Sequence, residues 1–123
     1  MKDILLSLLL CIAASLSPAA EKPLDPQPFF LKLIGSLEKN DYKTFVEAGD
    51  ADFQAAMTPA LIQGVSKQLA PRMKGVYGVA YFGSMKKKDY ETHLWKLTFK
   101  DGGDDILMSV SIRGDKVVGF IIK

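Results

Sequence analysis

The stretch Glu91–Phe99 reads Glu-Thr-His-Leu-Trp-Lys-Leu-Thr-Phe, and its pattern decides the predicted fold. Every second side chain shares one face, which carries Glu91, His93, Trp95, Leu97 and Phe99. This alternation is typical of a strand that is buried on one side. The stretch holds the only His and the only Trp of the chain, and two more strand-like runs follow it. We therefore expect it to be the central strand of an antiparallel sheet.

Other strand-like runs lie on both sides of this stretch. Before it, residues 77–85 alternate, and one face is expected to carry Tyr77, Val79, Tyr81 and Met85. After it, residues 106–112 and 118–122 alternate in the same way. Short polar turns separate the runs at residues 86–89, 101–104 and 113–115. Because short turns join neighbouring strands, the sequence predicts a four-stranded antiparallel sheet in chain order.

Three helices are expected ahead of the sheet. The first spans residues 28–39, where apolar side chains recur at helical spacing. Asp41 caps a second, shorter helix that ends at Gly49, and residues 53–57 add one helical turn at most. Helices followed by an antiparallel sheet define an α+β domain.

The third helix has the clearest start in the chain. Thr58 supplies a capping hydroxyl and Pro59 suits the first helical position. Its buried stripe is expected to consist of Leu61, Ile62, Val65 and Leu69. Pro71 is expected just beyond its end, because proline ends most helices.

The first twenty residues have the three-part pattern of a secretory signal. Lys2 gives a basic start, residues 4–16 are apolar apart from two serines, and small residues follow at 17–20. We expect cleavage after Ala19 or Ala20, and export to the periplasm or the medium of a bacterium. A retained N-terminal anchor is the alternative, although the run is shorter than the roughly 20 residues of a comfortable membrane span.

The expected segmentation is a signal at 1–20, a proline-rich extended lead-in at 21–27 and a single domain at 28–123. The only cysteine, Cys11, lies in the signal, and lipidation there is disfavoured because Leu10 is not small. The mature domain therefore lacks disulfides and cysteine metal ligands. A net charge of +2 does not indicate nucleic acid or an anionic membrane as a partner. No phosphate loop, metal-binding or nucleophile motif is present, so no cofactor and no metal are expected.

Three stretches carry turn and core patterns that resemble a known superfamily. Residues 33–45 hold a leucine stripe, then Asn-Asp-Tyr and Phe, and residues 61–75 form a helix that leads through glycine to a strand. Residues 97–120 hold Leu-Thr-Phe and later Arg-Gly-Asp-Lys-Val-Val-Gly-Phe. Together they are similar to the NTF2-like, cystatin-like roll, in particular its DUF3887-type branch. The resemblance implies a curved sheet that meets the helices around a cone. It assigns no catalytic residue, since the superfamily includes isomerases, dehydratases and non-catalytic binding modules.

Four residues are candidates for binding a ligand: Tyr77, Tyr81, His93 and Trp95. On one face of two paired strands they would form an aromatic wall with one titratable group, as small-ligand pockets do. Ordinary packing beneath the helices is the alternative. His93 and Glu91 are the candidate catalytic pair, because an imidazole oriented by a carboxylate can act as a general base. The alternative is a structural histidine that a neighbour or water satisfies.

Three hypotheses of function follow. The first is a small exported, non-catalytic domain that binds a small, partly apolar molecule or a protein partner. The second is an isomerase or hydro-lyase that uses His93 and a carboxylate in a conical pocket. The third is a dimerisation or structural module that uses the open sheet, for example as a homodimer. If Phe30, Leu33 and Leu61 fill the cone, the interface hypothesis is favoured over the ligand hypothesis.

Overall fold

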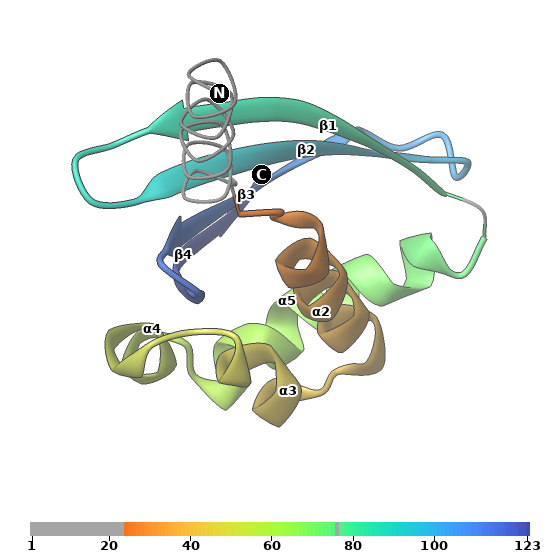
Figure 1. Ribbon diagram of the computed structural model, residues 1–123. Coiled ribbons are helices and arrows are strands. Elements are labelled where there is room, and N and C mark those ends of the chain that lie inside the picture. Colours follow the sequence, from red (N-terminus) through yellow and green to blue (C-terminus); the bar gives the residue numbers. More distant parts are fainter. Residues whose placement is uncertain (1–23, 76) are drawn as a thin grey trace, which may run out of the picture.

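The computed structural model describes residues 24–75 and 77–123. In these residues, helices precede strands (Figure 1): α2 (Gln27–Lys39), α3 (Tyr42–Glu47), α4 (Ala51–Ala56), α5 (Pro59–Met73), β1 (Tyr77–Lys86), β2 (Glu91–Phe99), β3 (Ile106–Arg113) and β4 (Lys116–Ile122). The helices gather on one side of the sheet (Figure 1), so the predicted α+β class is confirmed. The expected signal at 1–20 and the first residues of the lead-in lie outside the described residues.

The prediction of three helices is wrong, because residues 51–56 form a fourth helix of their own. The Asp50 carboxylate caps α4 by accepting a hydrogen bond from the Phe53 N–H at 2.9 Å. Phe53 is buried, and its ring stacks on that of Phe45 with the centroids 5.7 Å apart. A cap and one buried ring define this short helix, which has too few residues to show a helical period.

The predicted starts of α3 and α5 are confirmed. Asp41 accepts a hydrogen bond from the Thr44 N–H at the start of α3. The Thr58 hydroxyl accepts one from the Leu61 N–H at the start of α5. Both helices therefore begin where a side-chain oxygen satisfies a backbone donor that has no partner within the helix.

The expectation that Pro71 lies beyond α5 is wrong, because the helix continues through it to Met73. Two contacts hold this last turn. Met73 is buried in the core, and the Arg72 Nε donates to the Asp101 carboxylate at 2.7 Å. This hydrogen bond from Arg72 is also the main reason that the pKa of Asp101 is lowered. Such tertiary contacts outweigh the loss of one helical hydrogen bond at proline.

The sheet has the predicted order β1-β2-β3-β4, and all neighbouring strands are antiparallel. β2 is therefore an interior strand, as its sequence predicts. His93, Trp95 and Leu97 are buried on its helix-facing side, whereas the residues between them are only half-buried. We call the side that faces the helices the inner face of the sheet.

A β-bulge at Phe82 changes the register within β1. Tyr81 pairs with Trp95, but the next paired residue is Gly83, which has a φ of 123°. The bulge moves Met85 to the outer face, so the prediction that Met85 shares a face with Tyr81 is wrong. A glycine within a strand is a common sign of such a bulge.

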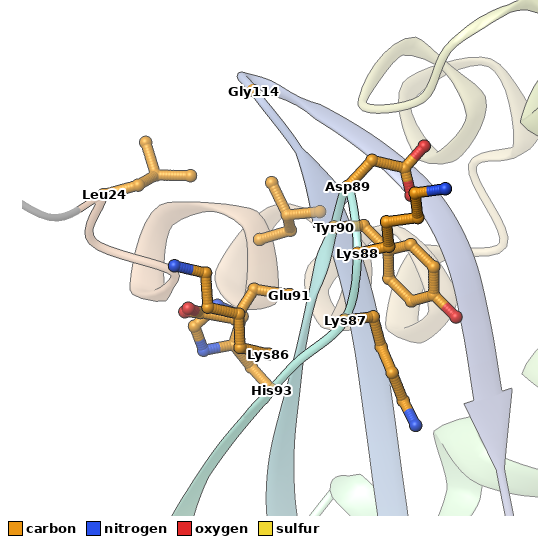
Figure 2. Close-up of a pocket in the computed structure, with 10 residues that line it drawn as sticks. Leu24, Lys86, Lys87, Lys88, Asp89, Tyr90, Glu91, His93 and Gly114 are labelled. Carbon is orange, nitrogen blue, oxygen red and sulfur yellow. The ribbon is translucent and has the colours of Figure 1, made fainter.

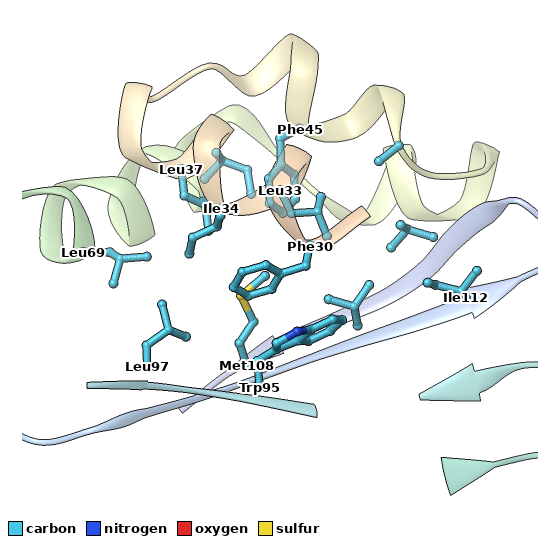
Figure 3. Close-up of a cluster of buried hydrophobic side chains, with 14 of the residues drawn as sticks. Phe30, Leu33, Ile34, Leu37, Phe45, Leu69, Trp95, Leu97, Met108 and Ile112 are labelled. Atoms are coloured by element: carbon cyan, nitrogen blue, oxygen red, sulfur yellow. The ribbon is translucent and has the colours of Figure 1, made fainter. Parts of the chain in front are cut away.

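The core lies between the helices and the inner face (Figure 3). Its stripe on α5 differs from the predicted one. Leu61 is 50% exposed, and the buried residues are Ile62, Ser66, Leu69 and Met73. Ser66 can be buried because its hydroxyl donates to the Leu37 carbonyl oxygen of α2. This contact sets the rotation of α5 and leaves Leu61 facing outward.

The two edges of the sheet differ. At β4, the Asp50 N–H donates to the Val117 carbonyl at 3.1 Å, and the Val117 N–H donates to the Ala48 carbonyl at 2.9 Å. The segment between α3 and α4 therefore pairs with this edge at Val117, near the start of β4. At β1, no other strand of the described residues pairs with the outer side.

Candidate functional site

His93 lies at the centre of a side-chain relay on the inner face. Its Nδ1 is 2.9 Å from the Tyr81 hydroxyl, and its Nε2 is 3.1 Å from a carboxylate oxygen of Glu91. The Tyr81 hydroxyl and Nδ1 are hydrogen-bonded, and which of the two donates depends on the imidazole tautomer. Nε2 and the Glu91 carboxylate form an ion pair only when the ring is protonated.

The environment of His93 favours this neutral form. The pKa of His93 is lowered, chiefly because burial disfavours the charged ring, and the Glu91 carboxylate opposes this only in part. The contact between His93 and Glu91 therefore lacks a full ionic attraction while the ring is neutral. The candidate pair His93 and Glu91 is brought together, and both residues line one pocket.

The four candidate ligand-binding residues do share the inner face. Tyr81 contacts both His93 and Trp95, with ring centroids 6.0 and 5.4 Å away. Tyr77 pairs with Phe99 at the other end of β1, and burial is the main cause that raises the pKa of Tyr77. The residues therefore form one aromatic row across β1 and β2.

Helix α2 covers part of this row. The Phe30 ring stacks on Trp95 with the centroids 4.6 Å apart, and only 1% of Trp95 is exposed (Figure 3). Leu33 is fully buried in the same core. The Trp95 Nε1 is buried without a hydrogen-bond partner among the described residues. The space above Trp95 is thus filled by the protein itself.

A pocket of about 390 Å³ opens beside this row, at the β1–β2 hairpin (Figure 2). His93 and Glu91 form part of its wall, together with Lys86, Ile112 and Leu24. Sequence analysis did not find the last three as site residues. Lys86 pairs with Glu91, and Glu91 pairs with Ile112, across three neighbouring strands. The hairpin turn could have indicated Lys86, whereas Leu24 and Ile112 are brought in by tertiary structure.

Strand β1 is the most exposed apolar element of the described chain. Val79 is 44% exposed, Tyr81 49% and Phe82 60%, and Met85 is exposed as well. Val79 and Tyr81 point to the inner face, beyond the reach of the helices, and Phe82 points to the outer face beside Lys96. Natural sheets usually protect such an edge with charges, but the first charged residue of β1 is Lys86, at its end.

Two further features of residues 24–75 and 77–123 bear on function. No helix there is both long and apolar enough to cross a membrane. In the same residues, no group of three or more His, Cys, Asp or Glu side chains is arranged so that it could hold a metal ion.

Comparisons with known proteins do not assign the chain to a family. No protein-family model matches the chain, and no curated protein matches it.

Proposed function

We propose that this chain is a small, exported, non-catalytic domain of the NTF2-like kind that assembles with a second copy of itself through strand β1. The observation that carries the proposal is the open edge of β1, which exposes apolar side chains on both of its faces. A second strand added there would satisfy the free backbone groups and cover those side chains.

The sequence of β1 suits pairing with itself. The segment Tyr77–Tyr81 precedes the bulge and contains no charged residue. In an antiparallel pair about a two-fold axis, Val79 would face Val79 of the second copy. Tyr77 of each copy would then lie opposite Tyr81 of the other. Aromatic and β-branched pairs of this kind stabilise neighbouring strands, and no like charges meet.

The β4 edge is less available for pairing with a second copy. Its Val117 backbone groups already bond to Ala48 and Asp50. A two-fold pair uses the same surface on both copies, so β1 alone is sufficient for a dimer.

The Nδ1 of His93 is hydrogen-bonded to the Tyr81 hydroxyl, so this nitrogen is already occupied within the chain. The filled space above Trp95 favours the interface hypothesis over a ligand at that residue.

Cysteine cross-linking tests the proposal. In the mature chain expected after cleavage, which contains no other cysteine, Val79→Cys places two thiols on the two-fold axis, where paired Cα atoms lie about 4.5–5.5 Å apart, within disulfide range. The matched control is Ile121→Cys, on the exposed outer face of β4. We expect a reducible dimer for Val79→Cys alone, and a sedimentation mass for the wild type of twice that of its own monomer.

Two results would overturn it. The first is a monomeric mass at tens of micromolar with equal cross-linking at both cysteines. The second is a monomer in which the outward-facing β1 amides are nevertheless protected from hydrogen exchange, because the edge would then be covered without a second copy.

A further inference from the structure

The pocket at the β1–β2 hairpin is a site separate from the β1 edge. It occupies the end of the inner face that α2 leaves uncovered, beyond the stack of Phe30 on Trp95. Figure 2 shows Lys86, Glu91 and His93 on one side of the hairpin and Leu24 across from them. The strand register agrees, because Lys86 pairs with Glu91 and therefore shares its face. At about 390 Å³, the pocket is near the lower end for small-molecule sites.

The charges around the pocket are unequal. Three lysines line it, at positions 86, 87 and 88, and none forms an ion pair with a described residue. Of the two acids, Asp89 contacts Arg113 at 3.3 Å, and a Glu91 oxygen lies 3.1 Å from His93 Nε2. Glu91 keeps its negative charge beside the neutral ring, so the three lysines outnumber the one acid that has no cationic partner. The local potential favours an anion.

The apolar part of the lining lies next to the lysine charge. Ile112 lines the pocket next to Glu91, with which it pairs across β2 and β3, and Leu24 also lines it. The neutral, nearly fully buried His93 ring adds a flat surface between them. A molecule that fits must combine one anionic group with a compact apolar body.

We propose that this pocket binds a small organic carboxylate with an apolar body. The carboxylate contacts the Lys86 ammonium group, and the body lies against Ile112 and Leu24. Glu91 stays next to His93, and its negative charge limits the affinity. An ammonium group beside apolar surface favours a ligand that offers both an anionic group and an apolar body.

Three probes of equal shape test the head group: phenylacetate, 2-phenylethanol and 2-phenylethylamine. We expect saturable binding of phenylacetate by calorimetry or by NMR shifts of the His93 ring. The alcohol should bind about tenfold more weakly, the effect of losing one charge-assisted hydrogen bond. The amine should not bind measurably.

Substitutions of Lys86 and Glu91, which pair across β1 and β2, should change phenylacetate affinity in opposite directions. Lys86→Met should weaken phenylacetate binding about tenfold, whereas Glu91→Gln, which keeps an acceptor for His93, should strengthen it. Lys100→Met, an exposed lysine in the β2–β3 turn away from the pocket, is the matched control and should change nothing. Unaltered melting curves will show that the variants fold.

Equal binding of acid and alcohol, or an unaffected Lys86→Met variant, would overturn the proposal. So would the absence of saturation at millimolar phenylacetate. The outcome does not depend on assembly, because Val79→Lys, which should disrupt pairing at β1, lies outside the pocket and should keep full phenylacetate affinity.

Discussion

The ring of Phe30 in α2 lies on the indole of Trp95 in β2, with the centroids 4.6 Å apart and the planes inclined by 25°. This contact joins the helical layer to the sheet at the centre of the inner face. It also ends the row of aromatic residues that the sequence places on that face. The pocket lies on the hairpin side of the stack, and the hydrophobic core lies on the other side.

Removing this contact should be costly. Phe30→Ala is expected to lower the free energy of unfolding by about 3–5 kcal/mol, the usual range for a buried phenylalanine. Water would then reach the indole, so Trp95 emission should shift to longer wavelength. Leu31→Ala, at the exposed neighbouring position, should stay within about 0.5 kcal/mol. Similar costs for both variants would show that α2 is rotated from the orientation described here.

The rotation of α5 gives a second test. Leu69→Ala should cost about 2–5 kcal/mol, because Leu69 is buried. Leu61→Ala should cost no more than about 0.5 kcal/mol, because half of Leu61 is exposed. Urea melts of the two variants measure the difference. A larger cost at Leu61 than at Leu69 would favour the stripe expected from sequence.

The buried His93 should make stability depend on pH. Its pKa in the folded chain is lowered by burial, whereas an unfolded histidine titrates near about 6.5. The unfolded state therefore binds more protons as the pH falls through and below that value, and the folded chain loses stability. Urea melts between about pH 7.5 and about pH 5 should show this loss, and His93→Gln should reduce it.

The pKa values of Asp41 and Asp101 are lowered by their hydrogen bonds to Thr44 and Arg72, so their effects on stability occur in more acidic solutions. Both groups are present in the wild type and in His93→Gln, so the difference between the two sets of melts reports on His93. A pH dependence that is identical with and without His93 would contradict the prediction.

Two glycines should respond oppositely to alanine. A Cβ at Gly49 would collide with the buried Phe53 ring, so Gly49→Ala should destabilise the fold by about 1–3 kcal/mol. Gly64 lies within α5 and has open space around it, so Gly64→Ala should stabilise the fold by up to about 1 kcal/mol. Thermal melts report both changes. If both variants changed stability in the same direction, the α3–α4 segment would have to adapt freely at the β4 edge.

The expected export signal can be checked directly. Mass spectrometry of protein recovered from the exported fraction should find a chain that starts at Ala20 or Glu21, because small residues at 17–20 suit a signal peptidase. A chain in that fraction that still begins at Met1 would contradict cleavage and favour the retained anchor.

The strands were predictable because each buries one face, and that burial appears directly as alternation in sequence. His93, Trp95 and Leu97 follow this rule. The stripe of α5 was predictable only in part, because Ile62 and Leu69 are buried as expected, whereas Leu61 is exposed. Ser66 is buried instead through its hydrogen bond to Leu37, which no pattern of apolar residues records.

The candidate site shows the same limit. The common face of Tyr81, His93 and Trp95 follows from alternation and strand pairing, so it could be predicted. The cover that Phe30 places on Trp95, and the approach of Leu24 to Ile112, depend on long-range packing that no local pattern records. The bulge at Phe82 was signalled only by Gly83.

The hydrogen bonds that tie Val117 to Ala48 and Asp50 limit how far association can proceed. A sheet with two available edges can recruit copy after copy, and that growth produces filaments. Here the α3–α4 segment already bonds to the start of β4, so a further copy that pairs along the whole of that strand must displace this segment. The backbone contacts that hold Gly49 against the sheet thus oppose the addition of further copies through β4.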